Sequence, residues 1–346
     1  DTVRIRHAGK QQKIKWLSIG DARENRMSFD WASHTPIRPK KLGITVFEDY
    51  SLDELAEFID WTPFFIAWEL AGKYPKILSD EVVGEEATRL FNDAKEMLKK
   101  IVNEKWFSAK GIFGLFPANS IGHDDIDVYI DDVGGDLLTT IHSLRQQTQK
   151  PPGQPNYALA DFIAPKEVGI QDYLGAFAVS CGFGMEERIK AFEEDHDDYS
   201  AIMLKALADR FAEAFAERLH QRIRKEFWSY ASDEVLSNED LISESYRGIR
   251  PAPGYPACPD HTEKRLLWDL LKVKEKIGIE ITESFAMYPT ASVSGWYFSH
   301  PSSRYFGLGK INKDQVHDYA KRKKMEVHQM QRWLAPNLGY DLEDTN

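Results

Sequence analysis

The chain has 346 residues, of which 42% are hydrophobic, 29% charged and 12% aromatic. This length allows one large domain or two of ordinary size. The composition excludes fibrous, disordered and membrane-spanning proteins, because no apolar run approaches the ~18–20 residues that a membrane helix needs. The 44 basic and 55 acidic side chains give a net charge of -11, which argues against a protein that coats nucleic acid phosphates.

Cysteine usage indicates the compartment in which the protein works. The sequence contains two cysteines, Cys181 and Cys258, whereas a secreted chain would usually carry a disulfide framework, so we expect a reducing, cytoplasmic compartment. No metal site is predicted, because there is no CxxC pair and the ten histidines lack ligand spacing. The first residue is Asp1 rather than Met, so we expect a module of a longer polypeptide.

The first part of the chain is predicted to form a basic arm followed by helices. Residues 1–50 contain many Lys and Arg side chains and few periodic apolar positions, which indicates an irregular arm or linker. A helix begins at Ser51, whose side chain can cap it while Glu54 reaches back, and ends near Asp60. An aromatic run follows in a second helix, and apolar residues at steps of three and four predict an amphipathic helix over 79–103.

The rest of the chain mixes strands and helices without regular alternation. Short apolar runs between turns predict strands at about 112–116, 126–130, 137–141, 173–180, 292–299 and 304–311. Helical periodicity predicts a pair over 185–228, whose second member begins near 196, and further helices at about 262–278, 313–323 and 326–334. This order favours an α+β fold with a central, mostly antiparallel twisted sheet flanked by helices.

One segment, "RPAPGYPACP" at 250–259, differs from the rest of the chain. Its four prolines exclude both helix and sheet ladder, so we expect an extended segment whose remaining N–H and C=O groups are unpaired and available to a ligand. Gly254 permits close approach of a flat group, Tyr255 offers a stacking face, and Arg250 can bind a carboxylate through two hydrogen bonds. A rigid linker or a proline-rich recognition tail is the alternative that composition leaves open.

The same segment carries a family resemblance. It resembles the S-adenosylmethionine-binding signature, Arg-x-x-x-Gly-Tyr with the following Pro and Cys, of the C-terminal activation domain of cobalamin-dependent methionine synthase. Further stretches resemble that domain in the same order, over roughly residues 28–341. They are "DWTPFF" at 60–65, "GKYP" at 72–75, "GLFPAN" at 114–119, "LADF" at 159–162, "HDDY" at 196–199, "ALADR" with "AEAFAE" at 206–217, "TESFAM" at 282–287, "SVSGWYFSHP" at 292–301 and "WLAPNLGY" at 333–340.

The resemblance implies a C-shaped single domain at 28–341, with a linker or N-terminal arm at 1–27 and a C-terminal tail at 342–346. In that family the domain binds S-adenosylmethionine in a shallow groove and presents its methyl group for reductive methylation of inactive cob(II)alamin. Flavodoxin or a flavoprotein reductase supplies the electron, and a neighbouring cobalamin-binding domain carries the cofactor. The complete enzyme would methylate homocysteine from methyltetrahydrofolate, and the isolated fragment would lack that activity.

The resemblance also implies binding residues, carried over by motif. Arg250 would bind the methionyl carboxylate, and the backbone from Ala252 to Tyr255 would hold the adenine. The full set of predicted S-adenosylmethionine-binding residues is Asp60, Glu213, Glu244, Arg250, Ala252, Gly254, Tyr255, Tyr305 and Phe306. Asp60 matches an acidic ligand contact of the family, and Tyr305 and Phe306 match the pair that closes over the ligand.

Elementary electrostatics agrees with this set, although each residue has a simpler interpretation. The ligand is a zwitterion with an additional sulfonium charge, so carboxylates should face its cationic groups and a guanidinium its carboxylate. On sequence alone, Asp60 could instead be a helix cap, and Glu213 and Glu244 could be solvated helix positions. No catalytic residue is predicted, because the sulfonium is a good leaving group and the domain need only hold and aim the methyl donor.

Two charged clusters have open interpretations. The acidic residues between 186 and 198 are typical of solvated helix ends, but Glu186, together with Asp209, could face the cobalamin-binding domain. The basic run Lys321–Lys324 could likewise be a solvated helix end, or it could steer an acidic flavodoxin.

Three hypotheses of function follow. The first is the methyl-donor-binding reactivation module of a cobalamin enzyme. The second is a stand-alone S-adenosylmethionine-dependent methyltransferase with its own acceptor. The third is an interaction domain whose proline-rich segment recognises a partner. The sequence lacks the D-x-H-x-x-G signature of corrin binding, so under the first hypothesis cobalamin must come from a neighbouring domain.

Overall fold

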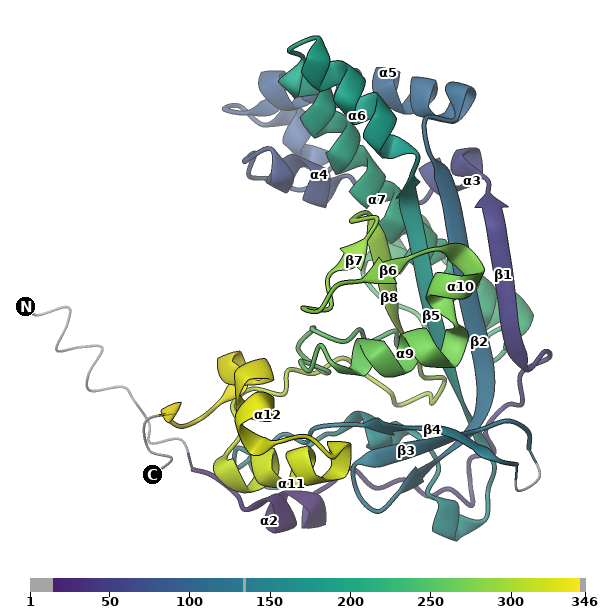
Figure 1. Cartoon of the computed structure of the whole chain (residues 1–346), viewed down its shortest axis with the longest axis vertical. Coiled ribbons are helices and arrows are strands. Elements are labelled where there is room, and N and C mark those ends of the chain that lie inside the picture. The colour runs from purple at the N-terminus through teal and green to yellow at the C-terminus, as the bar shows by residue number, and fades with distance from the viewer. Residues whose placement is uncertain (1–14, 133–134, 343–346) are drawn as a thin grey trace, which may run out of the picture.

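A six-stranded antiparallel sheet forms the centre of the molecule (Figure 1). The structure, a computed structural model, describes residues 15–132 and 135–342. The strands are β1 (Gly43–Tyr50), β2 (Ser108–Ile121), β3 (Asp125–Tyr129), β4 (Leu137–His142), β5 (Asp172–Phe183) and β8 (Ser292–Tyr297). Their order is β4-β3-β2-β5-β8, and β1 pairs with the first half of β2 on the edge that β3 uses further along.

Helices and short helical turns connect and cover these strands. The α-helices are α2 (Ile19–Glu24), α3 (Leu52–Ala56), α4 (Thr62–Ala67), α5 (Gly84–Glu104), α6 (Met185–Glu194), α7 (Asp198–Arg222), α8 (Asn238–Ile242), α9 (Glu263–Leu271), α10 (Val273–Ile277), α11 (Lys313–Lys323) and α12 (Val327–Trp333). A π-helical turn (Ile223–Phe227) extends α7, 3₁₀ turns lie at Lys76–Ser79, Leu159–Phe162, Lys166–Val168 and Ala335–Asn337, and β6 (Glu280–Ile281) pairs with β7 (Met287–Tyr288).

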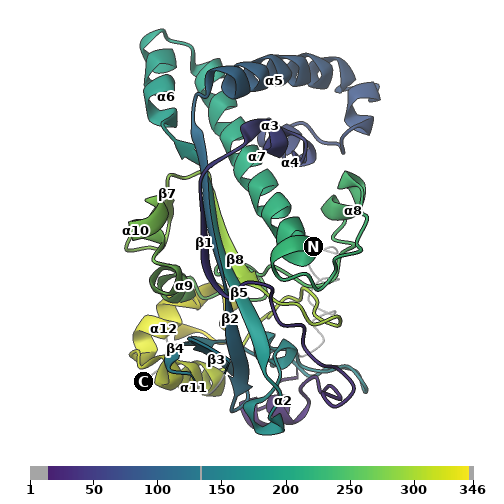
Figure 2. The same ribbon diagram turned by 90° about the vertical axis from the view of Figure 1, so that its right-hand side faces the viewer.

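Both faces of the sheet are buried. Alternate residues of a strand point to opposite faces, and on β5 Phe177 and Val179 join the core beneath α7 while Ala176 and Ala178 join the core on the other face. Figure 2 shows α7 along one face and α9 with α10 along the other. The long apolar runs of β2 and β5 are explained by this double coverage.

The molecule has the C shape that the family resemblance implied. In Figure 1, helices α4, α5, α6 and the first part of α7 form an upper lobe, and α11, α12, β3 and β4 form a lower lobe. The long strands β2 and β5 connect the two lobes, with α9, α10 and the β6–β7 hairpin between them. The predicted α+β class and antiparallel sheet are confirmed.

Several predicted elements are confirmed with changed boundaries. The Ser51 hydroxyl accepts a hydrogen bond from the Glu54 amide at 3.2 Å, as predicted, but the helix that it caps ends at Ala56 rather than near residue 60. The Glu54 carboxylate does not complete the capping box, because it accepts hydrogen bonds from Tyr50 Oη at 2.9 Å and Arg218 Nε at 2.6 Å.

Two predictions about strands were wrong. Residues 43–50 were expected to be part of an irregular arm, but they form β1, because the edge of β2 beside them offers a full row of partners. Residues 304–311 were expected to form a strand, but they run without a ladder along the proline-rich segment, where Leu308 N donates to Pro256 O at 2.8 Å. The free edge of β8 is already occupied by residues 249–251. The expected arm also contains helix α2 at Ile19–Glu24, so it is not irregular throughout. Its residues 1–14 lie outside the described residues, as do residues 343–346 of the tail.

The helix predicted over 262–278 is divided at Lys272, whose φ of 54° is left-handed. Leu271 and Val273 are both fully buried, although two positions apart in a continuous helix they would face away from each other. The left-handed residue between them therefore lets both side chains enter the core.

A close approach of α7 to the sheet, at Gly111, provides a test of this packing. A Cβ on Gly111 of β2 would lie 2.6 Å from Cζ of Phe215 on α7. We expect Gly111→Ala to lower the free energy of unfolding by about 1–3 kcal/mol in chemical denaturation, because the ring or the helix must move. The control is Gly20→Ala in α2, where the added Cβ would lie 3.6 Å from its nearest neighbour. Equal stability of the two variants would contradict this description of the packing.

Candidate functional site

A cavity of about 510 Å³ lies beside the edge strand β8, where the proline-rich segment meets α7. Its walls come from β5, α7, the residue at 244, the proline-rich segment, β8 and the segment at 305–307. The lining residues are Phe177, Glu213, Glu244, Arg250, Pro251, Ala252, Tyr255, Pro256, Ala257, Val293, Ser294, Tyr305, Phe306 and Gly307. A cavity of this size, with an apolar lining and a few charged groups, is typical of a small-molecule site.

The proline-rich segment is held against β8 by its backbone. Ile249 and Phe298 exchange two hydrogen bonds of 3.0 Å, and Trp296 N donates to Pro251 O at 2.9 Å. The segment then turns back on itself, with Gly254 N donating to Cys258 O at 2.7 Å. The expectation that its backbone groups are unpaired was therefore wrong for most of them. The edge of β8 supplies hydrogen-bond partners to the first residues of the segment, and the turn pairs the later residues with one another.

Two amides of this segment remain available. The N–H groups of Ala252 and Ala257 have no hydrogen-bond partner within 15–132 and 135–342, and both residues line the cavity. The Tyr255 side chain, which is 61% exposed, lies between them in sequence and also lines the cavity. The segment thus offers backbone donors and an aromatic face at the same wall.

Gly254 does not line the cavity, but it shapes the turn beneath it. Its φ of 97° lies in the region that favours glycine, and an added Cβ would overlap the imidazole ring of His261. A residue with a side chain would be strained there and would also displace the ring.

Arg250 is the cationic group of the cavity, and it is tightly held. Its Nη2 lies 2.7 Å from Oε2 of Glu217, and its Nη1 donates to the hydroxyl of Tyr246 at 2.8 Å and lies 3.2 Å from Nδ1 of His220. Its backbone N–H donates to Tyr305 Oη at 3.0 Å. Burial lowers the pKa of the Arg250 guanidinium, but Glu217, Tyr246 and Tyr305 together outweigh it and the pKa is raised.

Helix α7 supplies three polar groups to this site because they share one face. Glu213, Glu217 and His220 are separated by four and three residues, which places them in one row along the helix. His220 is fully buried, and burial together with the charges of Arg224 and Arg250 lowers its pKa well below the usual value. The neutral ring can then accept a hydrogen bond from Arg250 at Nδ1, which leaves the Nε2 hydrogen for Tyr230 Oη at 3.4 Å.

Glu244 also lines the cavity and is exposed. Partial burial of its carboxyl raises its pKa, the Glu217 carboxylate raises it further, and Arg250 opposes the shift. Glu213 and Glu244 are both exposed, so their carboxylates border the opening while Arg250 lies deeper. The site therefore combines a buried guanidinium with carboxylates at its mouth.

The structure brings most of the predicted binding residues together. Glu213, Glu244, Arg250, Ala252, Tyr255, Tyr305 and Phe306 line the cavity. Asp60 does not line it, and its carboxylate accepts a hydrogen bond from Thr62 N at 2.9 Å at the start of α4. Asp60 thus lies one residue before Trp61, the N-cap of α4, and ligand contact by Asp60 stays a prediction.

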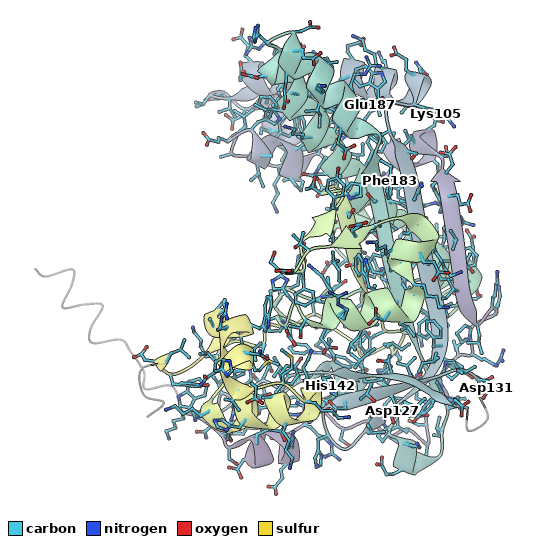
Figure 3. The ribbon with its side chains drawn as sticks, viewed as in Figure 1. Lys105, Asp127, Asp131, His142, Phe183 and Glu187 are labelled. Carbon is cyan, nitrogen blue, oxygen red and sulfur yellow. The ribbon has the colours of Figure 1, made fainter. Side chains whose placement is uncertain are left out.

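The two residues predicted to face the cobalamin-binding domain lie apart from the cavity lining. Glu186 is in the first turn of α6 and accepts a hydrogen bond from Tyr288 Oη at 3.0 Å. Asp209 is exposed on α7, one turn before Glu213. Figure 3 places Glu187, the neighbour of Glu186, in the upper lobe and His142 in the lower lobe.

The basic run Lys321–Lys324 is not a uniformly solvated helix end. Lys323 is buried and forms ion pairs with Asp260, at 2.7 Å, and with Glu263. Arg322 pairs with Asp318 at 2.9 Å. Two of the four charges in this run are therefore used in ion pairs within the protein, while Lys321 and Lys324 are exposed.

Sequence reasoning missed Glu217, His220 and Tyr246, which hold Arg250 in place. A signal for two of them was present, because Glu217 and His220 follow Glu213 at helical spacing on a helix that was predicted. Tyr246 precedes Arg250 by four residues in an irregular segment, and no pattern marks it.

Within residues 15–132 and 135–342, no group of three or more His, Cys, Asp or Glu side chains is placed to hold a metal ion. None of the described helices combines the length and apolar character needed to cross a membrane.

Comparison with known proteins identifies the family. The family described as "Vitamin B12 dependent methionine synthase, activation domain" matches residues 51–324. The chain belongs to this family. A solved crystal structure of the MetH reactivation domain bound to AdoHcy is 56% identical, covers 94% of this chain and 99% of its own, and superposes with a TM-score of 0.91. The resemblance inferred from the motifs is confirmed.

The turn at Gly254 of this activation domain gives a testable prediction. We expect Gly254→Ala to lower the free energy of unfolding by about 1 kcal/mol more than Gly153→Ala, measured by chemical denaturation. Gly153 is the matched control, because its φ of 82° carries the same backbone strain but no atom of the described residues lies within 4 Å of an added Cβ. An equal decrease in the free energy of unfolding of the two variants would show that contact with His261 does not affect stability.

Proposed function

We propose that this activation domain binds S-adenosylmethionine in the cavity beside β8 and presents its methyl group for reductive methylation of inactive cob(II)alamin. The observation that carries the proposal is the placement of the Arg250 guanidinium in a cavity whose mouth bears Glu213 and Glu244. This is the charge pattern that a zwitterion with a cationic sulfur requires. The AdoHcy bound to the related reactivation domain supports the same class of ligand.

The proposed binding mode follows from the groups that line the cavity. The ligand carboxylate binds Arg250, whose Nε has no partner among the described residues. The amine and the sulfonium face Glu213 and Glu244. The adenine lies against the proline-rich wall, where the N–H groups of Ala252 and Ala257 are available as donors and Tyr255 offers its ring.

The role of this chain in the reaction is to position the methyl donor. Cobalamin, carried by a neighbouring domain, supplies a strongly nucleophilic cobalt once flavodoxin or a flavoprotein reductase has provided an electron. The residues of the cavity need neither add nor remove a proton, because the sulfur leaves as a neutral thioether. Their contribution is orientation, which can lower a barrier by several kcal/mol when the geometry is right.

The proposed partners are the cobalamin-binding domain and the reductase. Glu186 and Asp209 are proposed to face the cobalamin-binding domain, on the side of the upper lobe and α7. Methylation of homocysteine from methyltetrahydrofolate belongs to the complete methionine synthase, and the fragment alone is proposed to lack it. Methyl transfer to a small acceptor without cobalamin would instead indicate a stand-alone methyltransferase.

The first test is the affinity for S-adenosylhomocysteine by calorimetry. We expect the protein to bind it and Arg250→Ala to bind about 10–100-fold more weakly, because hydrogen bonds to a charged carboxylate are lost. Arg89→Ala on α5 is the control, since Arg89 is exposed and its ion pair within the described residues is with Glu86 at 2.7 Å. No binding by the parent protein, or unchanged affinity in Arg250→Ala, would refute the proposal.

The raised pKa of Glu244 predicts how affinity depends on pH. As the pH falls through this raised pKa, the carboxylate takes up a proton and no longer attracts the ligand amine. An ordinary Glu side chain has a pKa of about 4.3, and its protonation would weaken binding only near that pH. Because the pKa of Glu244 is raised, affinity for S-adenosylhomocysteine should begin to fall at a higher pH. Glu244→Gln should bind more weakly near pH 8 and lose the upper part of this dependence in calorimetry from pH 8 to 5. Parallel profiles for the two proteins would contradict the assignment.

A further inference from the structure

Glu217 lies behind Arg250, outside the cavity lining. Its Oε2 is 2.7 Å from Nη2 of Arg250, and its side chain is only 12% exposed. It does not line the cavity, so a ligand that binds Arg250 meets Glu217 through the guanidinium and not directly. The residue therefore acts on ligands only through Arg250.

Among the described residues, the other oxygen of Glu217 has no hydrogen-bond partner. This atom, Oε1, is buried, and so is Nη1 of Arg224, which lies 4.0 Å away and likewise has no partner there. The remaining donors of Arg224 are used by Glu234, at 2.8 Å and 3.0 Å. A buried polar atom without a partner is costly, and here a donor and an acceptor of opposite charge face each other just beyond hydrogen-bond distance.

Glu217 thus stands between two buried guanidinium groups. It is paired with Arg250, and a small shift would bring Oε1 within reach of Arg224. A ligand carboxylate at Arg250 would add a second negative charge beside Glu217, and like charges at this distance in a partly buried site repel strongly. Of the two carboxylates, that of Glu217 is the one that can move, because Arg224 offers it an alternative partner.

We propose that Glu217 is a positioning residue that serves as the internal counter-ion of Arg250, that a ligand carboxylate competes with it for this guanidinium, and that Arg224 is its alternative partner. The inference rests on the proposed function, since it concerns how the same site recognises the carboxylate of its ligand. Glu217 keeps the buried Arg250 paired and in place, and in doing so it weakens the attraction of Arg250 for ligands that carry a carboxylate.

The test compares two ligands that differ only in the carboxylate. They are S-adenosylhomocysteine and its decarboxylated form, S-adenosyl-3-thiopropylamine, measured by calorimetry. Glu217→Gln keeps the shape and a hydrogen-bond acceptor but removes the competing charge. We expect the ratio of the two affinities to shift about three- to tenfold in favour of S-adenosylhomocysteine, as the loss of one nearby like charge predicts. A purely structural role would change both affinities alike.

The controls separate this inference from the proposed function. Glu226→Gln removes a carboxylate that follows α7 and pairs with Arg222, and it should leave the ratio unchanged. If the parent protein binds neither ligand, the proposed function fails. If the parent binds S-adenosylhomocysteine and Glu217→Gln leaves the ratio unchanged or lowers it, only the inference is overturned.

A second variant covers the case in which Glu217→Gln does not fold, as judged by thermal melting. Glu234→Gln removes the present counter-ion of Arg224, so Arg224 should draw Glu217 away from Arg250. The affinity ratio should then shift in the same direction as for Glu217→Gln. An unchanged ratio in folded Glu234→Gln would overturn the role assigned to Arg224.

Discussion

The site depends on keeping one guanidinium charged, desolvated and fixed in direction. Arg250 can be buried only because Glu217, Tyr246 and His220 surround it with an opposite charge and hydrogen-bond partners. A buried charge without such partners would cost several kcal/mol. The same partners hold the planar group in one orientation, so a ligand meets a preformed cation with little loss of side-chain entropy on binding.

The fold supplies these partners from two directions. Helix α7 packs on β5 and β8 through its apolar face and so brings Glu213, Glu217 and His220 to the edge of the sheet. Residues 249–251 extend that edge by pairing with β8, which places Arg250 beside the helix. Because prolines stop the ladder after this point, the chain leaves the sheet and forms the wall that carries Ala252 and Tyr255.

Elements that depend on a local sequence pattern could be predicted from the sequence. Elements whose structure depends on partners distant in sequence were harder to predict. The periodicity of α7, the hairpin strands and the cap at Ser51 were predictable because each follows from neighbouring residues. Strand β1 was missed because its partner residues on β2 lie 59 to 72 positions away in sequence. The motifs placed Arg250 in the site, but the residues that hold it form no motif, since their role is set by packing between α7 and an irregular segment. The division of one predicted helix at Lys272 has the same cause, because burial on both sides outweighs helix propensity.

The account depends most on where a ligand lies relative to the proline-rich wall. A crystal structure of this domain with S-adenosylhomocysteine measures that position directly. We expect the ligand in the cavity beside β8, with its carboxylate at Arg250, its amine toward Glu213 or Glu244, and its adenine along Ala252–Tyr255. Density for the ligand at any other position, without contact to Arg250, would contradict the central claim.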